Sequence, residues 1–184
     1  MADFTKRAIR SSFIKLLNEK PLKQISVRDI VDDCGINRNT FYYHFQDIPS
    51  LIETILEEDS ERLMQDPKLD SIEDCLNLII DLLIQNRKAV LHIYKSANRD
   101  FFEQHHWRIC HFIVRNYLDK KLDGNTVSEE DRAILGAYME SLLFGVVMGW
   151  LEKGLPEDIH RFVHRLCELK QGDLDLMIEK CRRL

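Results

Sequence analysis

Apolar residues recur at intervals of three and four along almost the whole chain, and this is the spacing of one face of an α-helix. No segment shows the strict alternation that is typical of a half-buried β-strand. Breaks at glycine, proline and polar residues divide the pattern into helices over about residues 5–18, 26–34, 37–45, 48–66, 71–85, 88–96, 100–122, 128–153, 156–170 and 174–183. The pattern therefore predicts an all-α protein, with a loop at Asp123–Asn125.

The segment 26–45, SVRDIVDDCGINRNTFYYHF, predicts two short helices joined by a tight turn. Ser26 and Asn37 are residue types that cap helix N-termini, because their side chains accept a hydrogen bond from the first turn. Gly35 ends the first helix, since glycine adopts the left-handed conformation without strain. A helix, a glycine turn and a second short helix form the helix-turn-helix arrangement.

The second of these helices has an apolar and a polar side. Phe41 and Phe45 are four residues apart and face the interior. The other side chains can hydrogen-bond to phosphate oxygens or to base edges; they are Arg38, Asn39, Thr40, Tyr42, Tyr43 and His44. This polar face predicts binding to double-stranded DNA.

The same segment resembles the DNA-binding motif of the TetR family of bacterial transcriptional repressors, V-x-x-I-A-x-x-A-G-V-S-x-x-T-x-Y-x-H-F. The matching positions are Val27, Ile30, Val31, Cys34, Gly35, Ile36, Asn37, Thr40, Tyr42, His44 and Phe45. Val31 and Cys34 replace small alanines, Asn37 replaces serine, and Ile48 stands where a phosphate-contacting lysine is common.

The resemblance implies a DNA-binding domain at residues 1–47 and a regulatory and dimerisation domain at residues 48–184. It implies phosphate contacts from Ser26, Arg28, Thr40, Tyr42 and His44. We expect Arg38, Asn39 and Tyr43 to read bases, because they lie early or outward on the second helix. It also implies that the dimer binds an operator until a small-molecule effector changes the spacing of its two DNA-binding domains.

The predicted helix 128–153 is apolar nearly all round between Ser141 and Leu151. Its glycines lower helix propensity by about 1 kcal/mol each, which suggests close approach of another backbone or a ligand. With helix 156–170 it predicts a four-helix dimer interface, as the resemblance also implies. The predicted interface residues are Gly145, Gly149, Trp150, Ile159, Phe162, Val163 and Leu166. The alternative is that both apolar stripes are buried within one monomer.

A dimer requires a palindromic operator, with half-sites about 34–36 Å apart. Aromatic residues of the C-terminal part can line an effector pocket, although an aromatic stripe is more often plain core. The predicted pocket residues are His92, Phe102, Cys110, Tyr138 and Phe144.

Two other regulators of the same fold stay open, one without an effector and one that senses a metal. The histidines behind the metal hypothesis are His105, His106 and His111 near Cys110, and the pair His160 and His164, four residues apart. No HExxH or paired-cysteine motif supports a metal site, and no cofactor is expected.

The 184 residues carry a formal net charge of −5, which is unusual for a DNA-binding protein. The distribution is more informative, because residues 1–46 hold eight basic against five acidic residues, and the remainder holds 18 against 26. Such an asymmetry orients the protein toward phosphate.

No secretory signal is visible at the N-terminus. The apolar run Ser141–Leu151 is too short to span a bilayer. The five cysteines are scattered, which suggests reduced thiols. No nucleophile elbow, phosphate-binding glycine loop or metal triad indicates an enzyme. The sequence thus predicts a cytoplasmic, homodimeric, sequence-specific DNA-binding regulator, a repressor released by an effector and without membrane partners. The competing class is a helical protein-interaction adaptor that does not bind DNA.

Overall fold

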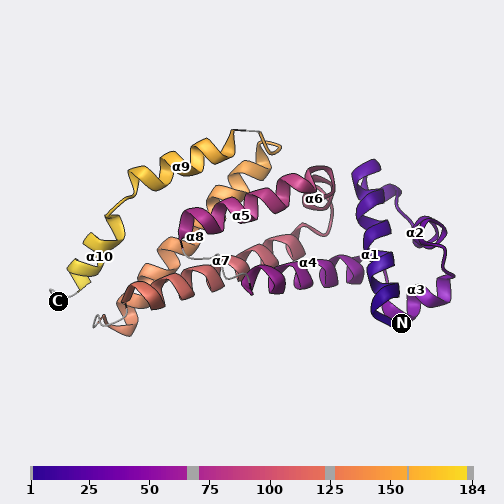
Figure 1. Cartoon of the computed structure of the whole chain (residues 1–184), viewed down its shortest axis with the longest axis horizontal. Helices are drawn as coiled ribbons and strands as arrows, with labels where there is room; N and C mark the ends of the chain where they lie inside the picture. The colour runs from indigo at the N-terminus through magenta and orange to yellow at the C-terminus, as the bar shows by residue number, and fades with distance from the viewer. Residues whose placement is uncertain (1, 66–70, 123–126, 157, 182–184) are drawn as a thin grey trace. The chain divides into compact units, whose positions relative to one another are not determined.

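The computed structural model describes residues 2–65, 71–122, 127–156 and 158–181. Within these ranges it contains helices and no strand, which confirms the all-α prediction. The elements are α1 (Ala2–Glu19), η1 (Leu22–Gln24), α2 (Val27–Cys34), α3 (Arg38–His44), α4 (Ile48–Met64), α5 (Ile72–Gln85), α6 (Arg87–Tyr94), α7 (Arg99–Leu122), α8 (Glu129–Glu152), α9 (Ile159–Leu169) and α10 (Asp173–Cys181) (Figure 1).

The chain divides into two compact units. Unit 1 comprises Met1–Arg62 and Gln85–His105, and unit 2 comprises Leu63–Ile84 and His106–Leu184. This division follows the density of contacts and does not test where an independently folding DNA-binding domain ends. The predicted boundary between residues 47 and 48 therefore stays a prediction.

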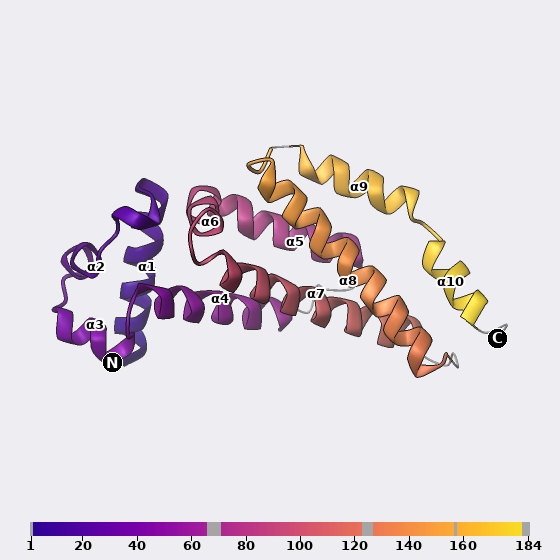
Figure 2. The same ribbon diagram turned by 180° about the vertical axis from the view of Figure 1, so that it is seen from behind.

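Helix α1 supplies the centre of unit 1. Its residues Ile9, Phe13 and Leu17 are buried, and Ile9 and Phe13 are fully inaccessible to solvent. Helices α2 and α3 pack beside it (Figures 1 and 2) and contribute Ile30 and Phe41 to the core. The Ser12 hydroxyl is buried with them and donates a hydrogen bond to the Ile30 carbonyl over 3.2 Å. The three helices thus form one small core.

Both ends of α2 and the start of α3 have the predicted chemistry. The Ser26 side chain accepts a hydrogen bond from the Asp29 amide, and the Asp29 carboxylate accepts one from the Ser26 amide, which completes a capping box. Gly35 adopts the left-handed conformation at φ 71°. Asn37 caps α3 by accepting a hydrogen bond from the Thr40 amide over 2.8 Å. These three predictions are confirmed.

Two further helices of unit 1 are held to α1 by polar contacts. Arg10 forms ion pairs with two carboxylates of α4, that of Glu58, at 2.9 Å between Nη1 and Oε2, and that of Asp59. Burial alone would lower the pKa of Arg10, but hydrogen bonds and charges from these carboxylates outweigh it and raise the pKa. On α6, the His92 Nδ1 atom lies 2.7 Å from the Leu17 carbonyl oxygen. Helix α1 therefore contacts both α4 and α6.

In unit 2, aromatic and polar contacts join helices that are distant in the sequence. The buried His106 ring of α7 stacks on Phe144 of α8, with centroids 5.3 Å apart. His160 and His164 of α9 lie within hydrogen-bond distance of Asn77 and Glu73, respectively, on α5. Helix α7 thus pairs with α8, and helix α5 pairs with α9.

Helix α8 has a buried and an exposed side despite its nearly uniform apolar composition. Leu143, Val147 and Leu151 are buried, whereas Gly145 and Gly149 are exposed. By length and composition the helix could cross a membrane, although 39% of its most apolar window is buried within the protein. Core helices of soluble proteins meet the same criteria, so length and composition alone do not make α8 a membrane span.

Some boundaries differ from the prediction. Helix α9 begins at Ile159 and not at Pro156, and Leu155 before it has a positive φ of 60°. The Trp150 indole nitrogen donates a hydrogen bond to the Pro156 carbonyl over 2.9 Å, which holds that segment outside the helix. The predicted helix end at residues 66–67, the loop at 123–125 and the end of the last helix at 183 lie outside the described residues.

Candidate nucleic-acid interface

The orientation of α3 is set by the burial of two phenylalanine side chains, one within the helix and one at its C-cap. Phe41 is fully buried and Phe45, at the C-cap, is 5% exposed. Because residues four apart share one helix face, this burial directs the remaining side chains outward. Tyr42 and Tyr43 are 55% and 82% exposed, an unusual exposure for large aromatic side chains. The outward face of α3 is therefore a polar and aromatic surface.

The eight residues predicted to contact DNA all lie on α3 or at the start of α2. Six of them are exposed, namely Ser26, Arg28, Arg38, Asn39, Tyr42 and Tyr43. Thr40 and His44 are half-buried. The structure thus brings the predicted residues together on two adjacent short helices, and it leaves their contact with DNA as a prediction.

Two hydroxyl groups in this set already donate hydrogen bonds. The Ser26 hydroxyl donates to the Asp29 carboxylate over 2.6 Å, and the Thr40 hydroxyl donates to the Asn37 side chain over 3.0 Å. Each would have to exchange this acceptor for a phosphate oxygen in order to contact DNA. The predicted phosphate contacts of both hydroxyls do not account for these local acceptors, because one hydroxyl proton serves one acceptor at a time.

The outermost polar groups of α3 are differently placed. Within the ranges that the structure describes, the guanidinium of Arg38, the amide of Asn39 and the hydroxyl of Tyr43 have no hydrogen-bond or ion-pair partner. Arg28 lies 3.4 Å from Asp32 on its own exposed helix face, a weak pair that another anion can replace. These groups are available to an incoming ligand at little cost in lost contacts.

The carboxylates of α2 are stabilised in their ionised form. Hydrogen bonds from the Ser26 hydroxyl and amide, with a contribution from Lys20, lower the pKa of Asp29 to about 2. A hydrogen bond from Lys15 at 2.6 Å lowers the pKa of Asp33. Lysines near the C-terminal end of α1 are therefore engaged with α2 and are not all available to DNA. Composition alone did not reveal this pairing.

The predicted effector residues are divided between the units. In unit 1, His92 contacts the Leu17 carbonyl, and the buried Phe102 packs edge-on against Tyr94. They therefore lie against helices of the unit that contains the helix-turn-helix. Their role in a pocket stays a prediction.

The other three predicted effector residues lie in unit 2. Cys110 is fully buried, with its sulfur 3.7 Å from the Nε2 atom of His106. Burial lowers the pKa of His106 to about 4 and raises the pKa of Cys110 to about 12, so both groups are neutral near pH 7. Phe144 covers the His106 ring, and Tyr138 is exposed beside Lys170.

The histidines considered as metal ligands have other neighbours. The Nδ1 atom of His111 lies 2.8 Å from the Glu140 carboxylate, and hydrogen bonding to Glu73 raises the pKa of His164. Among the residues that the structure describes, no three histidine, cysteine, aspartate or glutamate side chains converge in a way that could hold a metal ion.

The seven predicted interface residues fall into two sets. Trp150, Ile159 and Val163 are buried within the chain, so this part of the apolar stripe already serves the core of unit 2. The others are exposed or half-buried, namely Gly145, Gly149, Phe162 and Leu166. A Cβ atom built at Gly145 or Gly149 would meet nothing within 4 Å. This chain therefore makes no close approach there, and the space remains open.

Two family models match the chain. The model described as bacterial regulatory proteins of the tetR family matches residues 11–55, from α1 into α4. The model described as a transcriptional regulator C-terminal region matches residues 70–172, which is more than half of the chain. Together they cover both the helix-turn-helix and most of unit 2.

Among curated proteins, the HTH-type dhaKLM operon transcriptional activator DhaS of Lactococcus lactis is 37% identical over 62 residues, which are 34% of this chain. The uncharacterized HTH-type transcriptional regulator YxbF of Bacillus subtilis is 19% identical over 93% of this chain. The matched segments span 33% of the length of DhaS and 47% of the length of YxbF. The sequence likeness to the Lactococcus lactis relative is thus confined to part of each chain.

Solved structures show the same fold. The dihydroxyacetone kinase operon activator DhaS has a TM-score of 0.74 at 18% identity, over 98% of this chain and 97% of that one. A TetR transcriptional regulator from Rhodococcus sp. RHA1 has a TM-score of 0.57 at 16% identity, over 92% and 98%. At such identities the likeness concerns the arrangement of helices.

The capping box predicts how stability depends on pH. A depressed carboxylate pKa contributes stability above the unfolded-state value near 3.8, and this contribution is lost as the pH falls toward 2. In Ser26→Ala the main hydrogen bond to Asp29 is gone, so the pKa of Asp29 rises and stability falls less steeply between pH 4 and pH 2. The lost N-cap also lowers stability by about 1 kcal/mol near neutral pH.

Carboxyl NMR titration of Asp29, together with urea unfolding at several pH values, measures both effects. Ser11→Ala, at an exposed position of α1, is the matched control and should change neither quantity. An unchanged Asp29 pKa in Ser26→Ala would contradict the assignment.

Proposed function

The chain belongs to the TetR family of bacterial regulatory proteins, and we propose that it is a dimeric transcriptional regulator that recognises a palindromic DNA operator through α3. The observation that carries this proposal is the outward face of α3, where Arg38, Asn39 and Tyr43 are exposed over two buried phenylalanines. Regulators of this family are soluble cytoplasmic proteins that bind DNA operators and act as dimers. We infer the same location for this chain.

The roles of individual residues follow from their exposure. The Arg38 guanidinium can donate two hydrogen bonds to a guanine, and the Asn39 amide can donate one hydrogen bond to an adenine and accept one from it. Tyr43, the most exposed aromatic of the helix, offers a hydroxyl and an apolar ring at the same surface. Tyr42 and His44 lie beside it and are assigned to the phosphate backbone, which positions the protein without reading sequence.

The protein can regulate transcription in one of two directions, by repression or by activation. A repressor released by a small-molecule effector is the function that the sequence predicts. An activator is the second candidate, because a curated relative and a matching structure are both named as operon activators. A transcription reporter under the selected operator distinguishes them, since added protein lowers transcription in the first case and raises it in the second.

The proposal is tested by selecting bound sequences from a random duplex pool at two salt concentrations. We expect one palindrome to be enriched, with half-sites about one DNA turn apart, because two identical heads bind together. We also expect affinity to fall steeply with salt, since phosphate contacts release counterions. If no sequence is enriched and retention disappears at modest salt, the helical-adaptor alternative replaces DNA recognition.

A single substitution tests the division between positioning and reading residues. Tyr42→Phe removes one hydrogen bond to phosphate, so it should weaken binding to every operator about equally, by about 1 kcal/mol. Affinities for the selected operator and for single-base variants of it provide the measurement. Tyr43→Phe is the matched comparison at the proposed reading position and should change the ranking of the variants. A changed ranking with Tyr42→Phe would instead make Tyr42 a reader.

The exposed side of α8 leads to a prediction about the dimer. Gly149→Arg should be tolerated within one chain, because the site is open and arginine has a higher helix propensity than glycine. If this face packs against a second copy, the new side chain should separate the dimer into 21.8 kDa monomers and abolish tight operator binding.

Sedimentation equilibrium measures the mass, and circular dichroism verifies that the helices are retained. Asn116→Arg places the same side chain on an exposed position of α7 and should leave the dimer intact. A Gly149→Arg protein that remains dimeric would place the interface elsewhere.

A further inference from the structure

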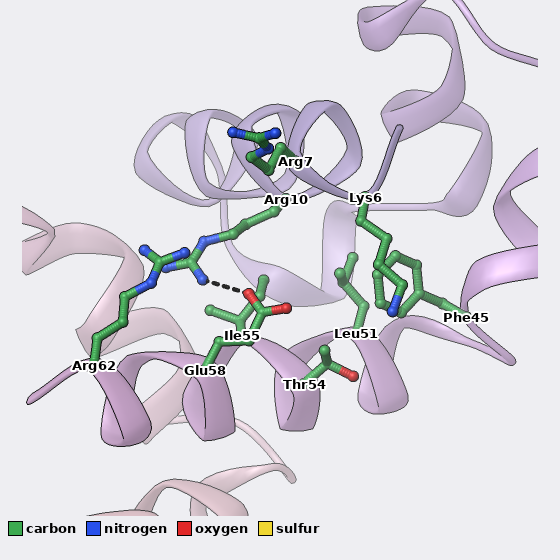
Figure 3. Close-up of a pocket in the computed structure, with 9 residues that line it drawn as sticks. All are labelled: Lys6, Arg7, Arg10, Phe45, Leu51, Thr54, Ile55, Glu58 and Arg62. Carbon is green, nitrogen blue, oxygen red and sulfur yellow. Dashed lines mark hydrogen bonds and ion pairs between the residues drawn. The ribbon is translucent and has the colours of Figure 1, made fainter. Parts of the chain in front are cut away.

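A cavity of about 180 Å³ lies between α1 and α4 in unit 1 (Figure 3). Four basic side chains contribute to its lining, Lys6, Arg7 and Arg10 from α1 and Arg62 from α4. Apolar groups that include Phe45 and Leu51 complete its wall. A cationic lining over an apolar wall is the composition of a site for a small organic anion, because charge provides attraction and the wall excludes water.

The charges of the cavity are unbalanced. Glu58 is the one carboxylate among its lining residues, and it is already paired with Arg10 at 2.9 Å. Asp59 also pairs with Arg10, so α4 fixes this guanidinium in place. Within the described ranges, Lys6 and Arg62 have no carboxylate partner. Figure 3 shows Arg62 on the same side of the opening as Arg10, whose guanidinium is paired with the Glu58 carboxylate.

We propose that this cavity binds a small molecule that carries one or two phosphate or carboxylate groups. Arginine suits such a ligand, because its planar guanidinium donates two parallel hydrogen bonds to a phosphate or a carboxylate. The volume lies below the roughly 300–1,000 Å³ of pockets for drug-sized ligands, so the occupant is small. None of the residues that line the cavity is among the predicted effector residues, and the proposal stands on the cavity and its charges without depending on DNA binding.

Binding there would connect two elements that bear on α3. Helix α1 packs against α2, and α4 begins four residues after α3 ends. An anion bound in the cavity between α1 and α4 would favour the spacing of these two helices that this structure shows. The ligand would thus stabilise one arrangement of unit 1 and provide an input to the DNA-binding helices.

The test is isothermal titration of the full chain with inorganic pyrophosphate, compared with sodium chloride at equal ionic strength. We expect saturable binding of one pyrophosphate per chain. Arg62→Gln and Lys6→Gln should each weaken it about tenfold, the effect of one lost charge-assisted hydrogen bond. Arg62 and Lys6 are exposed, so these changes leave the core intact. Arg115→Gln, on an exposed face of α7, is the matched control and should bind like the parent chain.

Binding of duplex DNA by the same proteins separates the anion site from a DNA-backbone contact. We expect Arg62→Gln to keep the affinity and salt dependence of the parent for duplex DNA. Absence of saturable pyrophosphate binding in the parent chain would overturn the proposal. It would also be overturned if Arg62→Gln and Lys6→Gln bound pyrophosphate as tightly as the parent chain does. If these variants instead weaken DNA binding alone, the cavity is a backbone contact. Failure of every protein to bind DNA would contradict the proposed function and leave the pyrophosphate result intact.

Discussion

The burial of Phe41 and Phe45 is the interaction on which the rest of the DNA-binding surface depends. A helix of seven residues is far below the roughly 12–15 residues at which isolated helices become marginally stable in water. Each buried phenylalanine contributes about 1.5–3 kcal/mol, and the Asn37 cap contributes about 1 kcal/mol more. Packing and capping, and not helix propensity, therefore hold α3 in place. The same two anchors fix the direction of every outward side chain, which makes specific contact with DNA possible.

The parts of this arrangement that depend on near neighbours in the sequence could be predicted. The caps at Ser26 and Asn37 and the left-handed Gly35 each act within four residues, so residue type was sufficient. Contacts across the fold could not be predicted. The pairing of Arg10 with Glu58 spans 48 residues, and the contact of His92 with Leu17 spans 75. Both contacts depend on how the helices pack against each other. The residues near each partner in the sequence do not determine that packing.

Helix α8 shows a second limit of local patterns. A helix that is apolar on all sides has no preferred face, so the sequence could not separate core residues from interface residues. The structure assigns Leu143 and Val147 to the core of unit 2 and exposes Gly145 and Gly149. The glycines are unfavourable in a helix, yet nothing in this chain occupies the space beside them. A partner that packs closely against this face would explain why glycine stands at these positions. The dimeric organisation of the family indicates that this partner is a second copy of the chain.

Charge distribution links the two proposed binding surfaces. Counting residues gave the N-terminal segment an excess of basic side chains, but the structure shows that several of them are neutralised locally. Lys15 and Lys20 pair with carboxylates of α2, and Arg10 pairs with carboxylates of α4. The positive potential that reaches solvent from this segment therefore comes from a smaller set of side chains, in which Arg38 faces outward on α3 and Lys6 of α1 borders the cavity beside α4. Because these two positions lie on different helices, an anion at one need not displace an anion at the other, and a small ligand and DNA can act on the same unit together.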